Sequence, residues 1–352
     1  MTQVSSSVTY GSSRATLTLL IVAALLGPVL QGCSSGLPLL SPRTPLFKPE
    51  PFPVFRHSGF RIATLNAEFL FDGIDDEGEA IFPWKADPQL ARTHRDRIGE
   101  TLRRLDADIV VIVEVENLHT LELLLNESLR GMEYRPYLVD GTDFFTGQDV
   151  GILSRIPIDE VTRTDVLARS DAGADLQGVS KNIIARFTLA GEEVSLIGLH
   201  LLSRPSDPER LQKRQGQAEV IRMAVADEVS AGREVIVAGD FNDFDDLIRD
   251  RNGNRPITDV LKRIKKAGPG DADDLVNVMA DVPQAARFTS HWDRDRDERV
   301  EVDELSAIDH ILLSKDLYRK VREVRFVHPY DPMTVTDHFP IVISLDLDNQ
   351  SN

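Results

Sequence analysis

Cysteine is almost absent from this 352-residue sequence, in which Cys33 is the single one. With one cysteine, no disulfide can form within the chain, whatever its compartment. Positive charge is also scarce, with 40 Lys and Arg against 57 Asp and Glu and a formal net charge of −17 at pH 7. This balance argues against a broad basic surface that holds nucleic acid by counterion release. A polyanion would have to be bound locally, through metal ions.

An apolar run long enough to span a bilayer is missing as well. The run from Leu17 to Leu30 has about 14 residues, fewer than the roughly 20 that a spanning helix needs. It leads into the sequence LQGC at residues 30–33, which resembles the lipobox of bacterial lipoprotein signal peptides. We therefore expect residues 1–32 to be a cleaved signal peptide and Cys33 to be acylated. An uncleaved membrane anchor with an incidental cysteine is the alternative.

This interpretation predicts an exported lipoprotein that is anchored in a membrane and faces the periplasm or the exterior. Ser34 is not the aspartate that retains lipoproteins in the inner membrane, so a Gram-negative source would place the protein in the outer membrane. Residues 33–58 begin with the lipidated cysteine and are rich in Ser, Pro and Gly, which is typical of a flexible tether. Residues 59–348 are then expected to form the folded domain, which contains no internal repeat.

The rest of the chain has the composition of a globular protein, with 41% hydrophobic and 28% charged residues. Short runs rich in β-branched residues alternate with amphipathic stretches. The predicted strands are Arg61–Asn66, Asp108–Glu114, Val150–Ser154, Ile183–Leu189, Val194–His200, Glu234–Asp240, Ile308–Ser314 and Ile341–Leu345. The predicted helices are Pro88–Leu105, Leu118–Leu129 and Pro208–Val229. In the first helix, Leu90, Ile98, Leu102 and Leu105 are expected to share one apolar face.

Polar residues that can bind metal or move protons follow several of these strands. Because strand ends meet at one edge of a sheet, we expect these side chains to line a common cleft. Each one taken singly also fits an ordinary turn former or helix cap. The residues are Asn66 with Glu68, Glu114, His200, Asp240 with Asn242 and Asp243, Asp309 with His310, and Asp337 with His338.

The order of these residues along the chain resembles that of the motifs in the endonuclease/exonuclease/phosphatase superfamily. This superfamily includes DNase I-like nucleases, abasic-site endonucleases, neutral sphingomyelinases and inositol polyphosphate phosphatases. The resemblance extends from about Phe60 to Leu347. The two most specific segments are Gly239–Asp243 (GDFND) and Asp337–Pro340 (DHFP). Val113 departs from the pattern, because the family commonly has Gln before the metal-binding glutamate. The resemblance implies an α/β, DNase I-like, four-layer sandwich of two packed mixed β-sheets flanked by helices.

The resemblance also implies a role for each site residue. Glu114 would bind Mg²⁺ or Mn²⁺, with Asn66, Asp337 and Glu68 completing the ligand set. His338 would act as a base or polarise the phosphate, and Asp309 would fix its tautomer. The remaining roles are water orientation by Asp240, a hydrogen bond to phosphate from Asn242, protonation of the leaving group by His200, and a phosphate contact from Arg155. Arg155 could equally pair with surface carboxylates.

A second metal signal lies in residues 293–304. Asp293, Asp295, Asp297, Glu301 and Glu304 occupy positions 1, 3, 5, 9 and 12 of a Ca²⁺ loop. Glu298 stands where such loops need Gly for a sharp turn. A solvated run of charges is the competing interpretation.

The sequence therefore predicts a monomeric, extracytoplasmic, metal-dependent phosphodiester hydrolase. A nuclease acting on DNA or RNA is favoured, because the motifs around Asn66 and Glu114 look closest to those of bacterial extracellular nucleases. A phosphodiesterase or phosphatase acting on lipid headgroups or small phosphoesters uses the same catalytic residues and stays an alternative. A binding module that has lost the chemistry is the least favoured, since every main catalytic position holds a competent residue.

Overall fold

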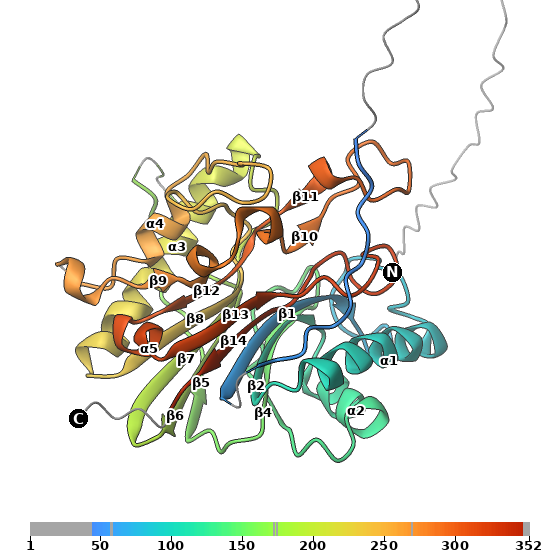
Figure 1. The fold of residues 1–352 in the computed structure, drawn as a ribbon, viewed down its shortest axis with the longest axis horizontal. Coiled ribbons are helices and arrows are strands. Elements are labelled where there is room, and N and C mark those ends of the chain that lie inside the picture. The colour runs from blue at the N-terminus through green and yellow to red at the C-terminus, as the bar shows by residue number, and fades with distance from the viewer. Residues whose placement is uncertain (1–43, 57–58, 172, 174, 269, 348–352) are drawn as a thin grey trace, which may run out of the picture. The chain divides into compact units, whose positions relative to one another are not determined.

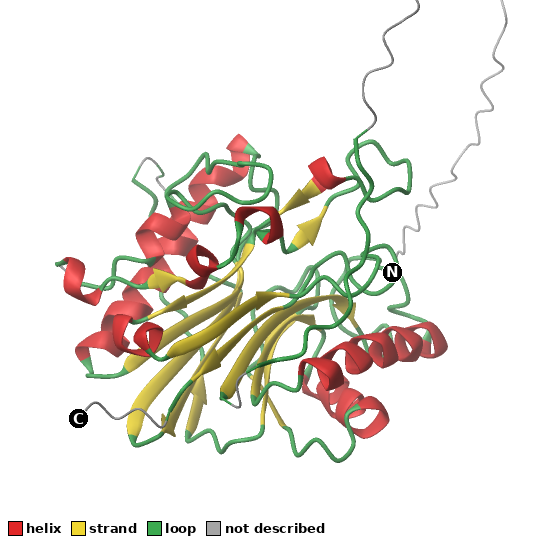
Figure 2. Ribbon diagram, in the orientation of Figure 1, coloured by secondary structure: helices red, strands yellow, loops and turns green. Residues whose placement is uncertain are grey.

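The computed structural model describes residues 44–56, 59–171, 173, 175–268 and 270–347. In this part of the chain, two mixed six-stranded sheets pack face to face and helices cover their outer faces (Figures 1 and 2). The predicted four-layer sandwich is thus confirmed. The predicted signal peptide and Cys33 lie outside the described residues and stay predictions.

The first sheet has the strand order β13-β14-β1-β2-β4-β3. Strands β1 and β2 pair in parallel, and the other neighbours in this sheet pair antiparallel. Its strands are β1 (Phe60–Leu70), β2 (Ile109–Val115), β3 (Arg135–Leu138), β4 (Asp149–Ser154), β13 (Val321–Phe326) and β14 (Ile341–Leu345).

The second sheet has the order β5-β6-β7-β8-β12-β9, in which only β7 and β8 are parallel. Its strands are β5 (Glu160–Thr162), β6 (Lys181–Leu189), β7 (Glu192–His200), β8 (Glu234–Asp240), β9 (Val276–Asn277) and β12 (Asp309–Leu313). A separate ribbon pairs β10 (Ser290–His291) with β11 (Leu305–Ser306). Each sheet thus contains one parallel pair, whose carboxyl ends lie side by side.

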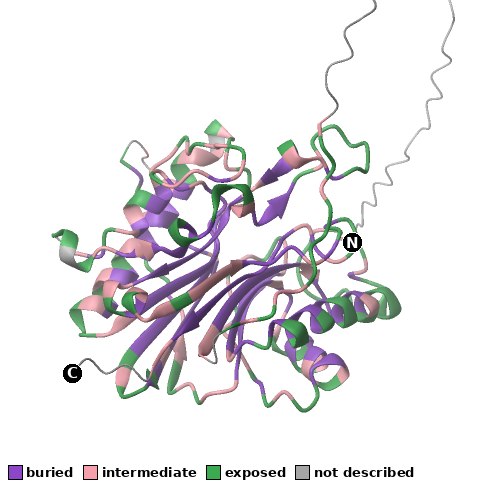
Figure 3. Ribbon diagram, in the orientation of Figure 1, coloured by how far each residue is buried: buried purple, intermediate pink, exposed green. Residues whose placement is uncertain are grey.

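The core fills the three spaces between the four layers. The central layer contains Val111 and Ile152 from the first sheet and Leu196 and Ile236 from the second, all fully buried or nearly so. Separate clusters fill the space between each sheet and its helices. Figure 3 shows buried residues along the strands of both sheets. Strands buried on both faces explain why these segments are continuous apolar runs rather than alternating ones.

The helices are α1 (Pro88–Leu105), α2 (Leu118–Ser128), α3 (Pro208–Ser230), α4 (Val260–Ile264) and α5 (Lys315–Arg319), with short 3₁₀ turns at Asp271–Asp273, Val278–Asp281, Gln284–Ala286 and Val302–Glu304. Helix α1 begins after Asp87, whose carboxylate accepts hydrogen bonds from the backbone N–H groups of Gln89 and Leu90. It ends at Asp106 in the left-handed conformation, with Arg103 and Arg104 in its last turn. Within the described residues, no helix combines the length and the apolar character needed to cross a bilayer.

Two details differ from the sequence predictions. Leu90 is exposed rather than part of the buried face of α1, because Ala91, one position further around the helix, shares the face of Ile98 and Leu102 and is buried instead. Residues 44–56 fall in the predicted tether but contact the domain. Phe47 packs on Phe288 and Phe339, and its backbone N–H donates to the carbonyl of Val300. This segment contains aromatic side chains that can be buried, which its Pro and Ser content did not reveal.

Candidate active site

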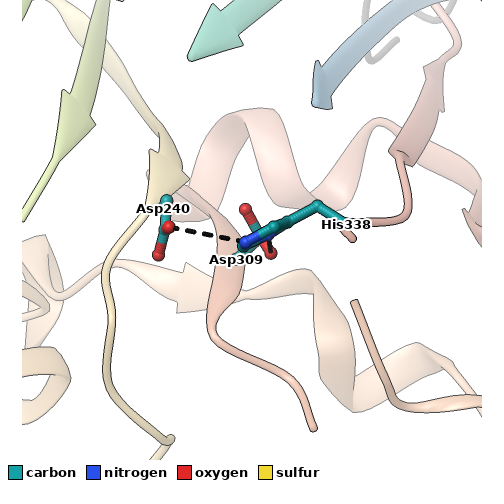
Figure 4. A group of neighbouring side chains, drawn as sticks. All are labelled: Asp240, Asp309 and His338. Carbon is teal, nitrogen blue, oxygen red and sulfur yellow. Dashed lines mark hydrogen bonds and ion pairs between the residues drawn. The ribbon is translucent and has the colours of Figure 1, made fainter. Parts of the chain in front are cut away.

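Five of the predicted site residues lie at or near the ends of core strands. Asn66 comes from β1, Glu114 from β2, His200 from β7, Asp240 from β8 and Asp309 from the start of β12. The strand pairing places His200 beside Asp240, and Asp240 opposite Asp309. His338, from the loop before β14, meets the same group of side chains (Figure 4). The convergence of strand ends that the sequence predicts is thus present in the structure.

A bulge in the β1–β2 pair shapes the first-sheet half of this site. The register shifts between Asn66 and Leu70 on β1, and between the residues that face them on β2. Glu68, Phe69 and Glu114 all have positive φ angles, of 45°, 61° and 63°. Non-glycine residues in this region are strained, and such strain concentrates at functional sites. Bulges of this kind re-aim a side chain, and here the re-aimed side chain is the Glu114 carboxylate.

The amide of Asn66 connects the two sheets. Its Nδ2 donates to Glu114 Oε1 at 3.1 Å and to Asp240 Oδ2 at 3.2 Å, so one buried amide holds two carboxylates from different sheets. Its Oδ1 accepts from the backbone N–H of Glu68 at 3.0 Å. Glu114 Oε2 accepts from the backbone N–H of Phe69 at 3.2 Å. Asn66 therefore organises the carboxylates that could hold a cation.

His338 and Asp309 form the tightest pair in the site. His338 Nδ1 donates to Asp309 Oδ2 at 2.7 Å, which leaves Nε2 facing Asp240 Oδ2 at 3.9 Å (Figure 4). Burial alone would lower the pKa of His338, but the charges of Asp309 and Asp337 outweigh it and hold the pKa well above its ordinary value. This environment favours the protonated imidazole, with one N–H directed at Asp309 and the other toward Asp240.

The carboxylates are crowded, and their charges are only partly balanced. Burial and the nearby Asp309 charge raise the pKa of Asp240 to about 8. Burial and the Asp337 carboxylate raise the pKa of Glu68 to about 8. Crowded carboxylates with raised pKa values mark a place where a hard divalent cation would be favourable. The predicted ligands Glu114, Glu68 and Asp337 interact electrostatically and offer the carboxylate oxygens that Mg²⁺ or Mn²⁺ prefers. They do not form a group in which one oxygen from each lies within 4.8 Å of the others, so a cation would have to draw them together.

Asp240, Asp309 and His338 also place one donor atom each within 4.8 Å of one another. This trio suits a metal ion less well than the carboxylates around Glu114 do, because His338 Nδ1 and Asp309 Oδ2 already share a hydrogen bond. We interpret it as a proton-handling group beside the cation site.

His200 lies between the two carboxylates from the other strands. Its Nε2 is 3.6 Å from Asp240 Oδ2 and 3.8 Å from Glu114 Oε1, and its buried Nδ1 has no hydrogen-bond partner. Burial lowers the pKa of His200 well below its ordinary value, so the ring is neutral at pH 7. Its predicted role as a proton donor needs a negative group, such as a phosphate, to raise that pKa.

Asn242, Asp337 and Glu68 are also close to the site. The backbone N–H of Asn242 donates to Asp240 Oδ1 at 2.8 Å, and its side-chain Nδ2 donates to the carbonyl of Leu201 at 3.0 Å. Glu68 Oε2 accepts from the backbone N–H of Asp337 at 2.9 Å. Asp337 Oδ1 lies 3.8 Å from His338 Nε2.

Arg155 is not brought to the site, and the predicted phosphate contact is corrected accordingly. Its guanidinium binds Asp106 at 2.7 Å, donates to the carbonyl of Met132 and lies over the Tyr134 ring. The neighbouring Ser154 pairs with Ile109, at the opposite end of β2 from Glu114. The alternative that the sequence left open, pairing with surface carboxylates, is the one observed.

Several side chains that sequence reasoning missed support the site. Gln148 Nε2 lies 3.4 Å from Glu114 Oε2, and Thr289 Oγ1 accepts from the backbone N–H of Asp309. Thr336 Oγ1 donates to the carbonyl of Asn66 at 2.9 Å. Tyr330 donates to the carbonyl of His338 at 2.6 Å. Only Thr336 carried a sequence signal, since it directly precedes the Asp-His pair.

The 293–304 segment forms part of the predicted Ca²⁺ loop. Asp293, Asp295 and Asp297 bring oxygens within 4.8 Å of one another, and Glu298 adopts the left-handed conformation, with φ 60°. The Glu304 carboxylate instead accepts from the backbone N–H of Arg294 and lies against His291. Glu301 caps the 3₁₀ turn that Glu304 ends, and neither belongs to the aspartate group. Ca²⁺ binding here stays a prediction, with three of its five ligands assembled.

Known proteins share this fold and sequence pattern. The profile of the Endonuclease/Exonuclease/phosphatase family matches residues 63–338. The uncharacterized protein YbhP of Escherichia coli K12 is 28% identical over 161 residues, which cover 42% of this chain and 58% of that protein. The chain thus spans less than two thirds of the curated relatives that it matches.

Two solved structures show the same architecture. An endonuclease/exonuclease/phosphatase family protein from Leptotrichia buccalis has a TM-score of 0.54 and 15% identity, covering 82% of this chain and 99% of its own. An AP endonuclease from Archaeoglobus fulgidus has the same TM-score, identity and coverage. At this identity the two structures establish a shared fold.

The His338–Asp309 pair yields a direct test of the electrostatics. In Asp309→Asn, loss of the carboxylate charge should lower the pKa of the His338 imidazole, because that charge favours the protonated ring. Nuclear magnetic resonance titration of the histidine side chains measures the shift. Asp303→Asn, which removes an exposed carboxylate, is the matched control and should leave the pKa unchanged. An unaltered His338 pKa in Asp309→Asn would contradict the assigned hydrogen bond.

Proposed function

Because this chain belongs to the endonuclease/exonuclease/phosphatase family, a family of phosphate-ester hydrolases, we propose that it is a divalent-metal-dependent nuclease. The observation that carries the proposal is the convergence of Glu114, Asp240 and His338 in one group of strand ends. Phosphodiesters resist hydrolysis because their negative oxygens repel nucleophiles, so a hydrolase needs positive charge beside the phosphate and a positioned base. The carboxylates of this group could hold a cation beside the phosphate, and the same group contains side chains that could act as the base.

The cation would be held by Glu114, with Glu68, Asp337 and Asn66 contributing oxygens, and would supply charge neutralisation at the phosphate. The charges of Asp309 and Asp337 favour protonated His338, and its Nε2 faces Asp240. It therefore suits a phosphate oxygen as a hydrogen-bond donor rather than a base. Of the two roles that the sequence left open for His338, the proposal therefore assigns polarisation of the phosphate.

Asp240 is left as the group that orients the attacking water and accepts its proton. Its Oδ1 is held by the backbone N–H of Asn242, and its Oδ2 points toward His200 and His338. Without a cation, burial and the Asp309 charge raise the pKa of Asp240 to about 8, and a cation bound nearby would lower this pKa, which would leave the carboxylate ionised and able to accept the proton at pH 7. Neutral His200, whose Nε2 lies 3.6 Å from Asp240 Oδ2, can take up that proton from Asp240 and pass it to the leaving oxygen. All of these side chains come from one chain, which supports action as a monomer.

Exposed aromatic side chains beside the site favour nucleic acid over small phosphoesters. Phe144 and Phe145 are 79% and 64% exposed, in the loop that leads to Gln148 beside Glu114. Trp292 is 69% exposed and follows His291, whose backbone N–H donates to the carbonyl of Asp337. Exposed rings on both approaches to a phosphodiester site can stack on bases, which offers affinity without a basic surface.

The nuclease proposal predicts that the purified chain hydrolyses DNA or RNA in Mg²⁺ or Mn²⁺, which is measured as product release. Glu114→Gln and His338→Ala should each lower kcat/KM by roughly 10²- to 10⁴-fold, because one weakens the cation site and the other removes a donor to the phosphate. Glu122→Gln, at an exposed position in α2, is the control and should retain full activity.

The same assay on sphingomyelin vesicles, inositol phosphates and a small aryl phosphodiester separates the substrate classes. Phe144→Ala combined with Phe145→Ala should weaken action on nucleic acid by about tenfold, since stacking contributes roughly 1–3 kcal/mol per base. It should leave the aryl diester unaffected. Faster hydrolysis of lipid or inositol phosphate than of any nucleic acid would replace the nuclease assignment with the alternative.

We further propose that the protein is exported and lipid-anchored through Cys33, on the basis of the LQGC sequence at residues 30–33. Metabolic labelling with palmitate tests this in cells that express the full chain. The wild-type chain should be labelled and recovered with membranes, whereas Cys33→Ala should be neither labelled nor processed. Equal labelling of the two chains would refute the anchor.

A further inference from the structure

A second group of carboxylates lies beyond the bulge, outside the candidate active site. Asp72 and Asp76, from the loop after β1, and Glu116, just after β2, each place an oxygen within 4.8 Å of the others. Glu116 Oε2 accepts from the backbone N–H of Asp72 at 2.8 Å, and the backbone N–H of Glu116 donates to the carbonyl of Leu70. None of these bonds is shared with Glu114, whose oxygens face Asn66, Phe69 and Gln148.

Glu116 has an unsatisfied oxygen in the interior of the protein. Its side chain is fully buried, and its Oε1 has no hydrogen-bond partner. Asp72 is 7% exposed, and its Oδ1 accepts from the backbone N–H of Ile74. Buried polar atoms are almost always paired, and a buried carboxylate without a partner is costly. The Glu116 oxygen therefore points to a ligand.

Cationic side chains of the protein do not neutralise this group. Lys85 pairs with Asp75 at 2.9 Å, and Arg95 pairs with Glu127 at 2.9 Å. Arg95 also donates to the carbonyls of Phe71 and Asp72 but leaves the Asp72 carboxylate free of an ion pair. Among the described residues, no salt bridge involves Asp72, Asp76 or Glu116. Three neighbouring carboxylates thus lack a counter-charge.

A proton shared between Glu116 and Asp72 is the competing explanation, because burial and the Asp72 carboxylate raise the pKa of Glu116 to about 8. It would not involve Asp76, which is exposed and lies within 4.8 Å of both. A divalent cation engages all three and uses the free Glu116 oxygen. We propose that Asp72, Asp76 and Glu116 form a second divalent-cation site, suited to Ca²⁺ because its donors are carboxylate oxygens on a loop that can adjust to a large ion. The site is independent of the proposed function.

An ion bound here ties the loop after β1 to the end of β2, two residues beyond Glu114. The same loop contacts the segment that contains Phe145, because the backbone N–H groups of Glu79 and Ala80 both donate to the Phe145 carbonyl. Occupancy of the second site therefore stiffens one wall of the candidate active site without touching its catalytic side chains.

The test measures Ca²⁺ bound per chain by equilibrium dialysis and elemental analysis. A background of Glu114→Gln with Asp295→Asn weakens both the active-site ion and the predicted loop site at residues 293–304. In this background we expect one Ca²⁺ to remain. Asp76→Asn should weaken its binding at least tenfold, and Asp76 is exposed, so this variant leaves the core intact. Glu79→Gln removes one exposed charge from the same loop and should leave binding unchanged.

Hydrogen exchange gives a second readout in the wild-type chain. Ca²⁺ should slow exchange of the backbone amides of residues 72–79, and Asp76→Asn should abolish this protection. Absence of bound Ca²⁺ in the double background would overturn the proposal. Equal Ca²⁺ binding by Asp76→Asn and Glu79→Gln would also overturn it, because the ion would then be bound elsewhere.

Discussion

The hydrogen bonds of the Asn66 amide hold the candidate active site together. One amide nitrogen donates to Glu114 in the first sheet and to Asp240 in the second. Away from this edge, the two sheets meet through apolar side chains, which fix their separation but not the alignment of their polar ends. The Asn66 amide supplies that alignment. The rest of the site, from the bulge that aims Glu114 to the facing of Asp240 toward His338, follows from it.

Crowded negative charge is a property that the whole chain shares with its two groups of carboxylates. The chain carries a net charge of −17, and carboxylates gather both in the active site and at Asp72, Asp76 and Glu116. Bound cations reverse the local potential at such places. An acidic protein can therefore act on a polyanion, with the cation supplying attraction that basic side chains supply elsewhere. If the substrate is nucleic acid, as proposed, exposed aromatic rings near the site would add affinity that does not depend on charge.

Much of this architecture could be predicted from the sequence, because buried strands are continuous apolar runs and their ends carry the reactive residues. Asn66, Glu114, His200, Asp240, Asp309 and His338 were all expected in one cleft, and they meet there. The family assignment followed from the order of these motifs. Short strands such as β10 and β11 were missed, because two residues carry no periodicity.

The errors have physical causes that a sequence does not display. Arg155 was given a role at the phosphate because its motif is near others in the chain, but β4 runs antiparallel to β2 and carries Arg155 to the far end. Gln148 was overlooked, because a single amide in a loop has no pattern until the fold brings it to Glu114. The bulge at Glu68 and Phe69 was also invisible, since it depends on strand register.

The central claim is that Glu114 and its neighbours form a cation-dependent hydrolytic site. The most direct measurement is anomalous diffraction from crystals of the full chain soaked in Mn²⁺. The account predicts an Mn²⁺ peak within about 2.3 Å of a Glu114 carboxylate oxygen, on the same side of the site as Asp240 and His338. Mn²⁺ bound elsewhere on the chain with no peak at Glu114 would contradict it.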